Sequence, residues 1–212
     1  AQVWAQNAAS SRHLSSPKKH TPSMQIITVG RLVGFKGFRL ALMAFAKHLK
    51  TFPESRLTLL GDGKEKRDLE SLCARLDIQH HVTFAGQVPR EMVLNLMGKS
   101  QVFLFPSFEG AGMVVIEAMA KGLPVVCLDF GGPGEYVTEE CGIKVPLTEP
   151  AAVIQGLADG LSRLASDKEL YERLSAGAIE RVREHYLWDH IGDRLNVLYQ
   201  EVMAETGRPI KG

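Results

Sequence analysis

The sequence has no long apolar run, no excess of charge of one sign and few cysteines. No apolar run approaches the ~20 residues needed to span a bilayer, and the N-terminus lacks the apolar core of a signal peptide. The formal net charge of +1 argues against a dedicated nucleic-acid-binding protein, because such proteins carry a marked basic excess. We therefore expect a cytoplasmic globular protein that binds no nucleic acid, with peripheral contact at the inner face of the membrane left open.

Patterns typical of metal sites are also missing. Cys73, Cys127 and Cys141 make an odd count without metal-type spacing, which favours free thiols in a reducing cytoplasm. His80 and His81 are adjacent, but no third ligand is in view, so we interpret them as surface residues. The chain has no Asp-x-Asp pair. The sequence therefore predicts no metal and no cofactor.

The length of 212 residues suits one large domain flanked by tails. Residues 1–23 are polar, with Ser-Pro and Thr-Pro pairs, and we interpret them as a linker or N-terminal extension. Residues 24–186 alternate between apolar runs and amphipathic patterns, and they form the predicted domain. Residues 187–212 are predicted to be a final helix and tail.

Short apolar runs separated by helical patterns organise the predicted domain. The runs predict buried strands over residues 25–29, 56–60, 82–86, 102–105, 124–128 and 142–146. This order predicts an α/β fold, a Rossmann-like, doubly wound, mostly parallel sheet with helices on both faces. Residues 129–135 are expected to be a flexible loop. Ligands of such sheets bind beyond the carboxyl ends of the strands.

Two cations lie in the turn after the first strand. Arg31 and Lys36 follow Gly30, and together they can clamp a diphosphate, arginine by its planar fork and lysine as a point charge. The alternative is a pair of solvated loop cations. The turn is no Walker loop, because the glycine spacing is wrong and neither Ser nor Thr follows Lys36.

A second loop, after the strand over residues 102–105, combines glycines with two carboxylates. Gly110 and Gly112 allow close approach of the backbone to a ligand, and the following helix begins with unpaired amides that favour an anion. Glu109 and Glu117 would repel a phosphate but can accept hydrogen bonds from hydroxyls. A phosphate flanked by hydroxyl groups describes a sugar nucleotide.

These two loops carry a resemblance to a known family. The Glu109–Glu117 pair, followed by Ala-Met-Ala-x-Gly-x-Pro-Val-Val, and the earlier Gly-Arg-Leu-x-x-x-Lys-Gly resemble motifs of the group 1 glycosyltransferases. The resemblance covers residues 26–199. It implies the donor-binding, C-terminal half of a GT-B fold. The implied reaction is transfer of a hexosyl group from a UDP-, GDP- or ADP-linked sugar to an acceptor hydroxyl, with the anomeric configuration retained.

The resemblance also implies roles for individual residues. Arg31, Lys36 and the amides near Gly112 would stabilise the departing diphosphate. Glu109 would bind donor-sugar hydroxyls or act as a nucleophile, and Glu117 would bind the ribose. The remaining implied donor-binding residues are Gly30, Gln87, Val88, Gly110, Ala111, Met113 and Val114. Ala111 departs from the family, whose members often have Phe there, so the shape of the sugar pocket is less defined.

Partners follow from the same resemblance. A GT-B enzyme holds its acceptor, here a glycan or a lipid-linked sugar, mainly on an N-terminal domain that this chain lacks, so we expect little turnover from this chain alone. A role in polysaccharide or glycolipid synthesis is the expectation. Two alternatives stay open: a non-catalytic nucleotide-sugar-binding module, and another GT-B enzyme such as a sugar-nucleotide epimerase or a glycogen-type synthase. The final helix would cross to the missing domain and expose apolar residues, Ile191, Leu195, Leu198 and Tyr199 among them.

Overall fold

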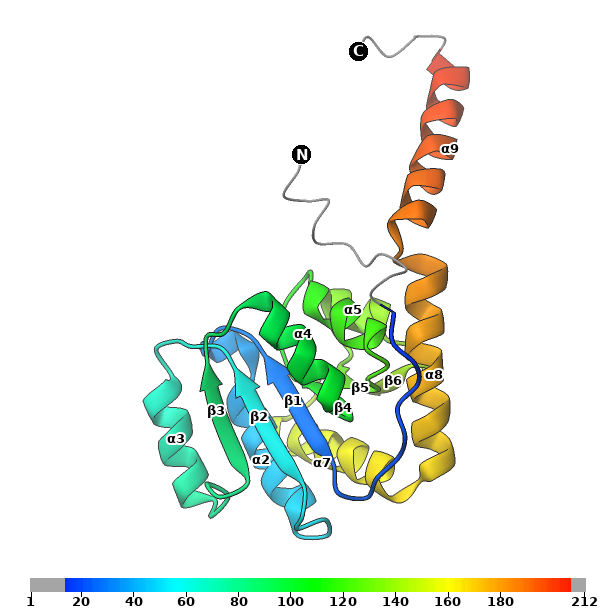
Figure 1. The fold of residues 1–212 in the computed structure, drawn as a ribbon. Helices are drawn as coiled ribbons and strands as arrows, with labels where there is room; N and C mark the ends of the chain where they lie inside the picture. The colour runs from blue at the N-terminus through cyan, green and yellow to red at the C-terminus, as the bar shows by residue number, and fades with distance from the viewer. Residues whose placement is uncertain (1–13, 207–212) are drawn as a thin grey trace.

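The fold is a six-stranded parallel sheet between two layers of helices (Figure 1). The structure, a computed structural model, describes residues 14–206, except the side chains of residues 188–191, 193, 194, 205 and 206. The strands lie in the order β3-β2-β1-β4-β5-β6, and all their pairings are parallel. Their bounds are β1 Gln25–Val29, β2 Arg56–Leu60, β3 Val82–Gly86, β4 Val102–Phe105, β5 Val125–Leu128 and β6 Gly142–Val145. The predicted doubly wound α/β sheet is confirmed.

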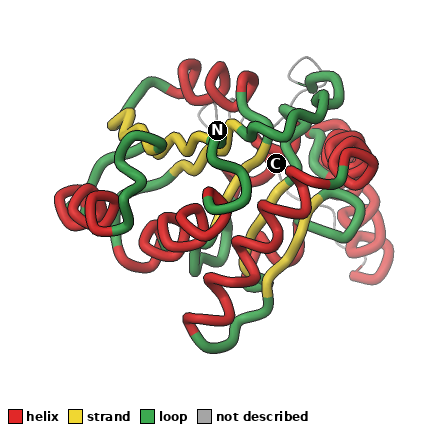
Figure 2. The backbone as a smooth tube through the Cα atoms, turned by 90° about the horizontal axis from the view of Figure 1, so that it is seen from below, coloured by secondary structure: helices red, strands yellow, loops and turns green. Residues whose placement is uncertain are grey.

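Helices cover both faces of this sheet (Figure 2). One face packs against α2 (Phe38–Leu49), α3 (Lys66–Arg75) and α7 (Pro150–Ser166). The other packs against α4 (Arg90–Lys99), α5 (Met113–Ala120) and α8 (Lys168–His185). Because parallel strands need crossover connections, each helix returns the chain to the same end of the sheet. All the loops that follow the strands therefore lie together at the carboxyl end of the sheet.

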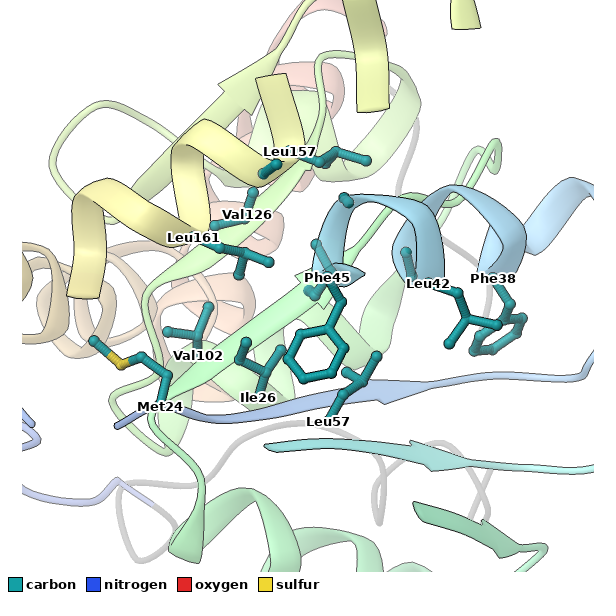
Figure 3. Close-up of a cluster of buried hydrophobic side chains, with 14 of the residues drawn as sticks. Met24, Ile26, Phe38, Leu42, Phe45, Leu57, Val102, Val126, Leu157 and Leu161 are labelled. Atoms are coloured by element: carbon teal, nitrogen blue, oxygen red, sulfur yellow. The ribbon is translucent and has the colours of Figure 1, made fainter. Parts of the chain in front are cut away.

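Two apolar clusters form the core. On the α2 side, Phe45 packs with Ile26, Leu57 and Leu161 (Figure 3). The other cluster contains Phe103 and Phe105, while Val102 and Leu104 of the same strand point to the first cluster. Every residue of β4 and of β5 is buried, which explains why these strands have continuous apolar sequences instead of alternating ones.

The segment before β1 forms neither helix nor strand over residues 14–23, but it is attached to the domain. It runs along α8 (Figure 1). The Ser15 amide donates to the Ala120 carbonyl at 2.9 Å, and the Lys18 amide donates to the Ser175 hydroxyl at 2.6 Å. The His20 ring lies edge-on to Tyr171. The predicted linker or extension thus packs on the domain from residue 14 onward, and residues 1–13 lie outside the described part.

The prediction of a flexible loop over residues 129–135 is wrong. Residues Gly131–Tyr136 form the short helix α6. Pro133 lies in its first turn, where proline's missing N–H needs no partner. The Gly132 amide donates to the Gly110 carbonyl at 2.7 Å and so holds the start of α6 against the loop after β4. This contact between distant segments stabilises a helix that glycine propensity disfavours.

The last helix, α9 (Trp188–Thr206), continues away from the sheet (Figure 1). Its exposed apolar side chains are Leu195, Val197, Leu198, Tyr199, Val202 and Met203, each 40–55% accessible. The expected exposed apolar face is therefore confirmed for residues 195–199, while the Ile191 side chain is not described. No helix in residues 14–206 combines the length and the apolar character that a bilayer span requires.

Candidate functional site

The candidate site lies where the strand order reverses direction. The chain builds β1, β2 and β3 outward on one side and β4, β5 and β6 outward on the other, so β1 and β4 are neighbours at the switch point. The connections leaving β1 and β4 must diverge there, and they leave a crevice beyond the carboxyl ends of the strands. Both predicted motif loops follow these two strands. The topology therefore brings together residues that are about 75 positions apart.

A cavity of about 340 Å³ opens beside this crevice. Loops after three neighbouring strands line it, with Arg31 after β1, Asp62 after β2, and Gln87 and Val88 after β3; its other lining residues are Val29, Gly30, Leu60, Gly61 and Val93. The predicted residues Gly30, Arg31, Gln87 and Val88 are thus brought together. The lining combines apolar side chains such as Val29 and Leu60 with the charged Arg31 and Asp62, a composition that suits a heterocycle joined to an anion.

Arg31 and Lys36 have different surroundings. The Arg31 side chain is exposed and pairs with no carboxylate among the described residues. Lys36 is the last residue of the one-turn 3₁₀ helix η2 (Gly34–Lys36), and the lysine side chain is only 14% accessible. Its ammonium lies 5.4 Å from the ring centroid of Phe35 and 6.0 Å from that of Phe105. Aromatic faces favour a cation at such distances.

Lys36 connects the cavity with Glu109. The lysine Nζ forms an ion pair with Glu109 Oε2, and the glutamate side chain is only 18% accessible. A Cβ on Gly30 would lie 3.5 Å from Cδ of Lys36, so the lysine stem passes along the cavity wall. The Phe108 amide donates to the Phe35 carbonyl at 2.8 Å, which joins the two loops. Lys36 and Glu109 therefore lie next to the loop that carries Arg31.

The start of α5 presents amides next to Glu109. No described residue accepts a hydrogen bond from the amides of Met113 and Val114, as expected for the first turn of a helix. Gly112 precedes this turn with φ +57°, and a Cβ there would lie 2.6 Å from Pro133. Gly112 therefore serves the backbone turn and the packing of α6, whereas the space beside Gly110 is open. Ala111 is exposed between them.

Glu117, in the second turn of α5, pairs with an arginine that the sequence reading missed. Arg90 Nη2 lies 2.7 Å from Glu117 Oε1, with the two side chains 45% and 25% accessible. Arg90 is the first residue of α4 and comes directly after the Gln87–Pro89 segment. Its place beside that segment could have suggested a role, but the 27 residues separating it from Glu117 hide the contact.

Other charged groups lie away from the switch point. A larger cavity, of about 440 Å³, adjoins the outer strand β6, but its Lys144 pairs with Asp129 at 3.0 Å and its Arg173 donates to the Glu139 carbonyl. His80 is exposed, and Nδ1 of His81 lies 2.7 Å from an Arg56 nitrogen. Among the side chains that the structure describes, no three from His, Cys, Asp or Glu gather as metal ligands.

The sequence matches the profile of the family described as "Glycosyl transferases group 1" over residues 12–181, which is most of the chain. The chain belongs to this family. It is 34% identical over 185 residues to an uncharacterised glycosyltransferase of Methanocaldococcus jannaschii, covering 86% of this chain and 46% of the relative. It is 28% identical over 179 residues to the alpha-D-kanosaminyltransferase of Streptomyces kanamyceticus, covering 84% and 45%. The chain thus spans less than half the length of either relative.

The fold of this group 1 glycosyltransferase chain matches solved structures of the GT-B class. The pneumococcal O-GlcNAc transferase GtfA, solved in complex with UDP and GlcNAc, superimposes with a TM-score of 0.79 at 20% identity, covering 92% of this chain and 38% of that one. At this identity the likeness shows the fold. The family profile includes both motif loops, so Arg31, Lys36, Glu109 and Glu117 all lie inside the matched segment.

Proposed function

We propose that this chain is the donor-binding half of a retaining glycosyltransferase that takes a hexosyl group from a nucleoside diphosphate sugar. The proposal rests mainly on the ion pair between Lys36 and Glu109, which lies at the switch point next to the cavity lined by Arg31. A cation for the diphosphate and a carboxylate for sugar hydroxyls are needed side by side in a donor site. A structural neighbour that holds UDP and GlcNAc supports the same ligand class.

In the proposed arrangement the base and ribose occupy the cavity and the diphosphate lies over Arg31, Lys36 and the first amides of α5. Negative charge on the diphosphate grows as the glycosidic bond breaks, so donors fixed in place beforehand stabilise the transition state more than the ground state. Lys36 leaves Glu109 to contact the phosphates, and Glu109 then accepts hydrogen bonds from hydroxyls of the donor sugar. The chain's own cations and amides supply the charge compensation in this scheme.

The acceptor is proposed to be a hydroxyl of a glycan or of a lipid-linked sugar, presented by a second domain that faces the crevice. The relatives are about twice as long as this chain, which supports such a domain. Orientation of two reactants can contribute ~7–11 kcal/mol of rate acceleration. A chain that binds the donor without positioning the acceptor should therefore transfer the sugar very slowly.

Calorimetric titration with UDP, GDP, ADP and their sugar conjugates, without divalent metal, tests the donor proposal. We expect one nucleotide to bind the wild-type chain and Arg31→Ala to weaken that binding at least tenfold, because Arg31 supplies a charged hydrogen bond to the diphosphate. Arg75→Ala is the matched control, since Arg75 is an exposed arginine in the last turn of α3. Absence of binding to all three nucleotides at millimolar concentration would contradict the proposal.

A further inference from the structure

Arg90 and Glu117 form an ion pair between two helices that cover the same face of the sheet. Arg90 is the first residue of α4, and Glu117 lies midway along α5. Nη2 of Arg90 lies 2.7 Å from Oε1 of Glu117, which makes a charge-assisted hydrogen bond. Only one carboxylate oxygen, Oε1, takes part in that bond. The other oxygen keeps its lone pairs for a further donor.

The position of Arg90 relates this contact to the cavity. Val88 and Val93, which line the cavity, lie two residues before Arg90 and three residues after it. Residues three apart on a helix share a face, so Arg90 and Val93 are neighbours along α4. The first turn of α4 therefore connects the cavity wall, through Val93, with the Glu117 carboxylate, through Arg90.

We propose that Arg90 is a positioning residue that orients the Glu117 carboxylate toward the ribose hydroxyls of the donor. The inference rests on the proposed function and goes beyond it, because neither motif loop contains Arg90. With Oε1 held by the arginine, the second oxygen of Glu117 faces the nucleotide and accepts from the ribose. A glutamate side chain has several rotatable bonds, so holding it in one orientation reduces the entropy lost on binding.

The same contact has an electrostatic consequence. The nucleoside diphosphate is strongly anionic, and the carboxylate of Glu117 would repel it. The guanidinium of Arg90 compensates that charge locally. Arg90 thus lets a carboxylate serve as a hydroxyl acceptor beside an anion. A lysine at this position would keep the charge but lose the planar, directional N–H groups of the guanidinium.

A double-mutant cycle tests whether Arg90 acts through Glu117. Affinities for the nucleoside diphosphate that binds the wild type are measured calorimetrically for Arg90→Ala, Glu117→Gln and the double variant. We expect each single change to weaken binding about fivefold to tenfold and the double change to be no worse than Glu117→Gln alone, since coupled residues are not additive. Additive losses would overturn the inference. Arg75→Ala serves as the charge-matched control.

A nucleotide without ribose hydroxyls gives a second measurement, which should not change if Arg90 has only a structural role. The wild type should bind the 2′,3′-dideoxy form of the same nucleotide about tenfold more weakly than the natural form. The ratio of the two dissociation constants, dideoxy form over natural form, should fall to about two in Arg90→Ala. In Arg90→Lys the ratio should lie between two and ten. Equal weakening of both nucleotides by Arg90→Ala would overturn the inference.

The outcomes separate this inference from the proposed function. If the wild type binds no nucleotide, the proposed function fails and the role of Arg90 fails with it. If the wild type binds and Arg31→Ala weakens binding at least tenfold, but Arg90→Ala leaves the ribose ratio unchanged, the donor site stands and the positioning role is wrong. Unfolding by urea checks that each variant folds, and we expect no loss beyond that of Arg75→Ala.

Discussion

At the scale of single residues, the candidate site is defined by which charges face each other. Lys36 is held by Glu109 and by two aromatic rings, whereas Arg31 has no carboxylate partner in the described part of the chain. The arginine is therefore ready for an anion, while the lysine must exchange one anionic partner for another. This difference predicts that the two cations contribute differently to binding.

Replacing Glu109 with Gln should strengthen the binding of a nucleoside diphosphate that carries no sugar. The variant loses the carboxylate that competes for Lys36, and it also loses a negative charge near the phosphates, so we expect about a fivefold gain in affinity. The added affinity of the sugar conjugate over the diphosphate should shrink, because an amide is a weaker acceptor for sugar hydroxyls.

Calorimetry on Glu109→Gln, with Glu169→Gln as the charge-matched control, measures both effects. Glu169 lies in the first turn of α8, and its side chain is exposed. A Glu109→Gln variant that binds the diphosphate more weakly than the wild type would show that Glu109 supports the phosphate site instead of competing for Lys36.

At the scale of elements, His48 joins α2 to its neighbours inside the protein. Its ring is buried, with Nδ1 3.1 Å from the Ser162 hydroxyl of α7 and Nε2 2.9 Å from the Ser55 hydroxyl before β2. It stacks on Phe52 with ring centroids 5.0 Å apart. Burial lowers the pKa of His48 from 6.5 to about 4, because the charged ring would lose its hydration.

This lowered pKa predicts a dependence of stability on pH. Between pH 6.5 and 4 the unfolded chain binds a proton at His48 that the folded chain does not, so the free energy of unfolding rises with pH across this window. The His48 contribution is fully present above pH 6.5 and is lost as pH falls toward 4. We expect the wild type to lose about 2 kcal/mol between pH 7 and pH 5 through this group.

Urea unfolding at pH 7 and pH 5, on the wild type and on His48→Gln, measures the His48 contribution. Glutamine can keep hydrogen bonds to the two serines but does not titrate. The variant should be less stable than the wild type at pH 7, and its loss of stability on acidification should be smaller by about 2 kcal/mol. Equal losses in both proteins would show that His48 titrates normally in the folded state.

At the scale of the whole molecule, the domain buries its sheet but leaves apolar side chains of its last helix exposed. The core clusters draw on every strand, whereas α9 carries apolar side chains from Leu195 to Met203 that are 40–55% accessible. An apolar stripe of this kind normally lies against another surface. In the proposed function that surface is the second domain that presents the acceptor.

Changing Val197 and Leu198 together to Gln should leave the domain's stability almost unchanged. Both side chains are more than half exposed, so little buried area is lost, and we expect the free energy of unfolding to change by less than about 0.5 kcal/mol. Binding of the dye ANS should fall, because the exposed apolar area shrinks. Leu161→Ala, in the core beneath α7, should by contrast cost about 2–5 kcal/mol. A comparable loss in the α9 variant would show that this helix packs on the domain.

The strands, the fold class, the family and the residues of the two motif loops could all be predicted before the structure was known. These features are recorded in short-range patterns: a continuous apolar run such as Val102–Phe105 predicts a strand buried on both faces. The final helix could likewise be predicted from periodicity, whereas the exposure of its apolar residues from 195 to 199 was predicted from the resemblance to the GT-B fold. The roles assigned to Arg31, Lys36, Glu109 and Glu117 stay predictions.

Which of these residues contact one another depends on how the strands and helices are arranged in space. Lys36 contacts Glu109 because β1 and β4 are neighbours at the switch point, and Arg90 contacts Glu117 because α4 and α5 cover the same face of the sheet. The helix α6 and the attachment of residues 14–23 to α8 likewise depend on partners far away in the sequence. Local spacing records burial and turn chemistry, whereas contacts between remote residues arise from strand order and helix packing.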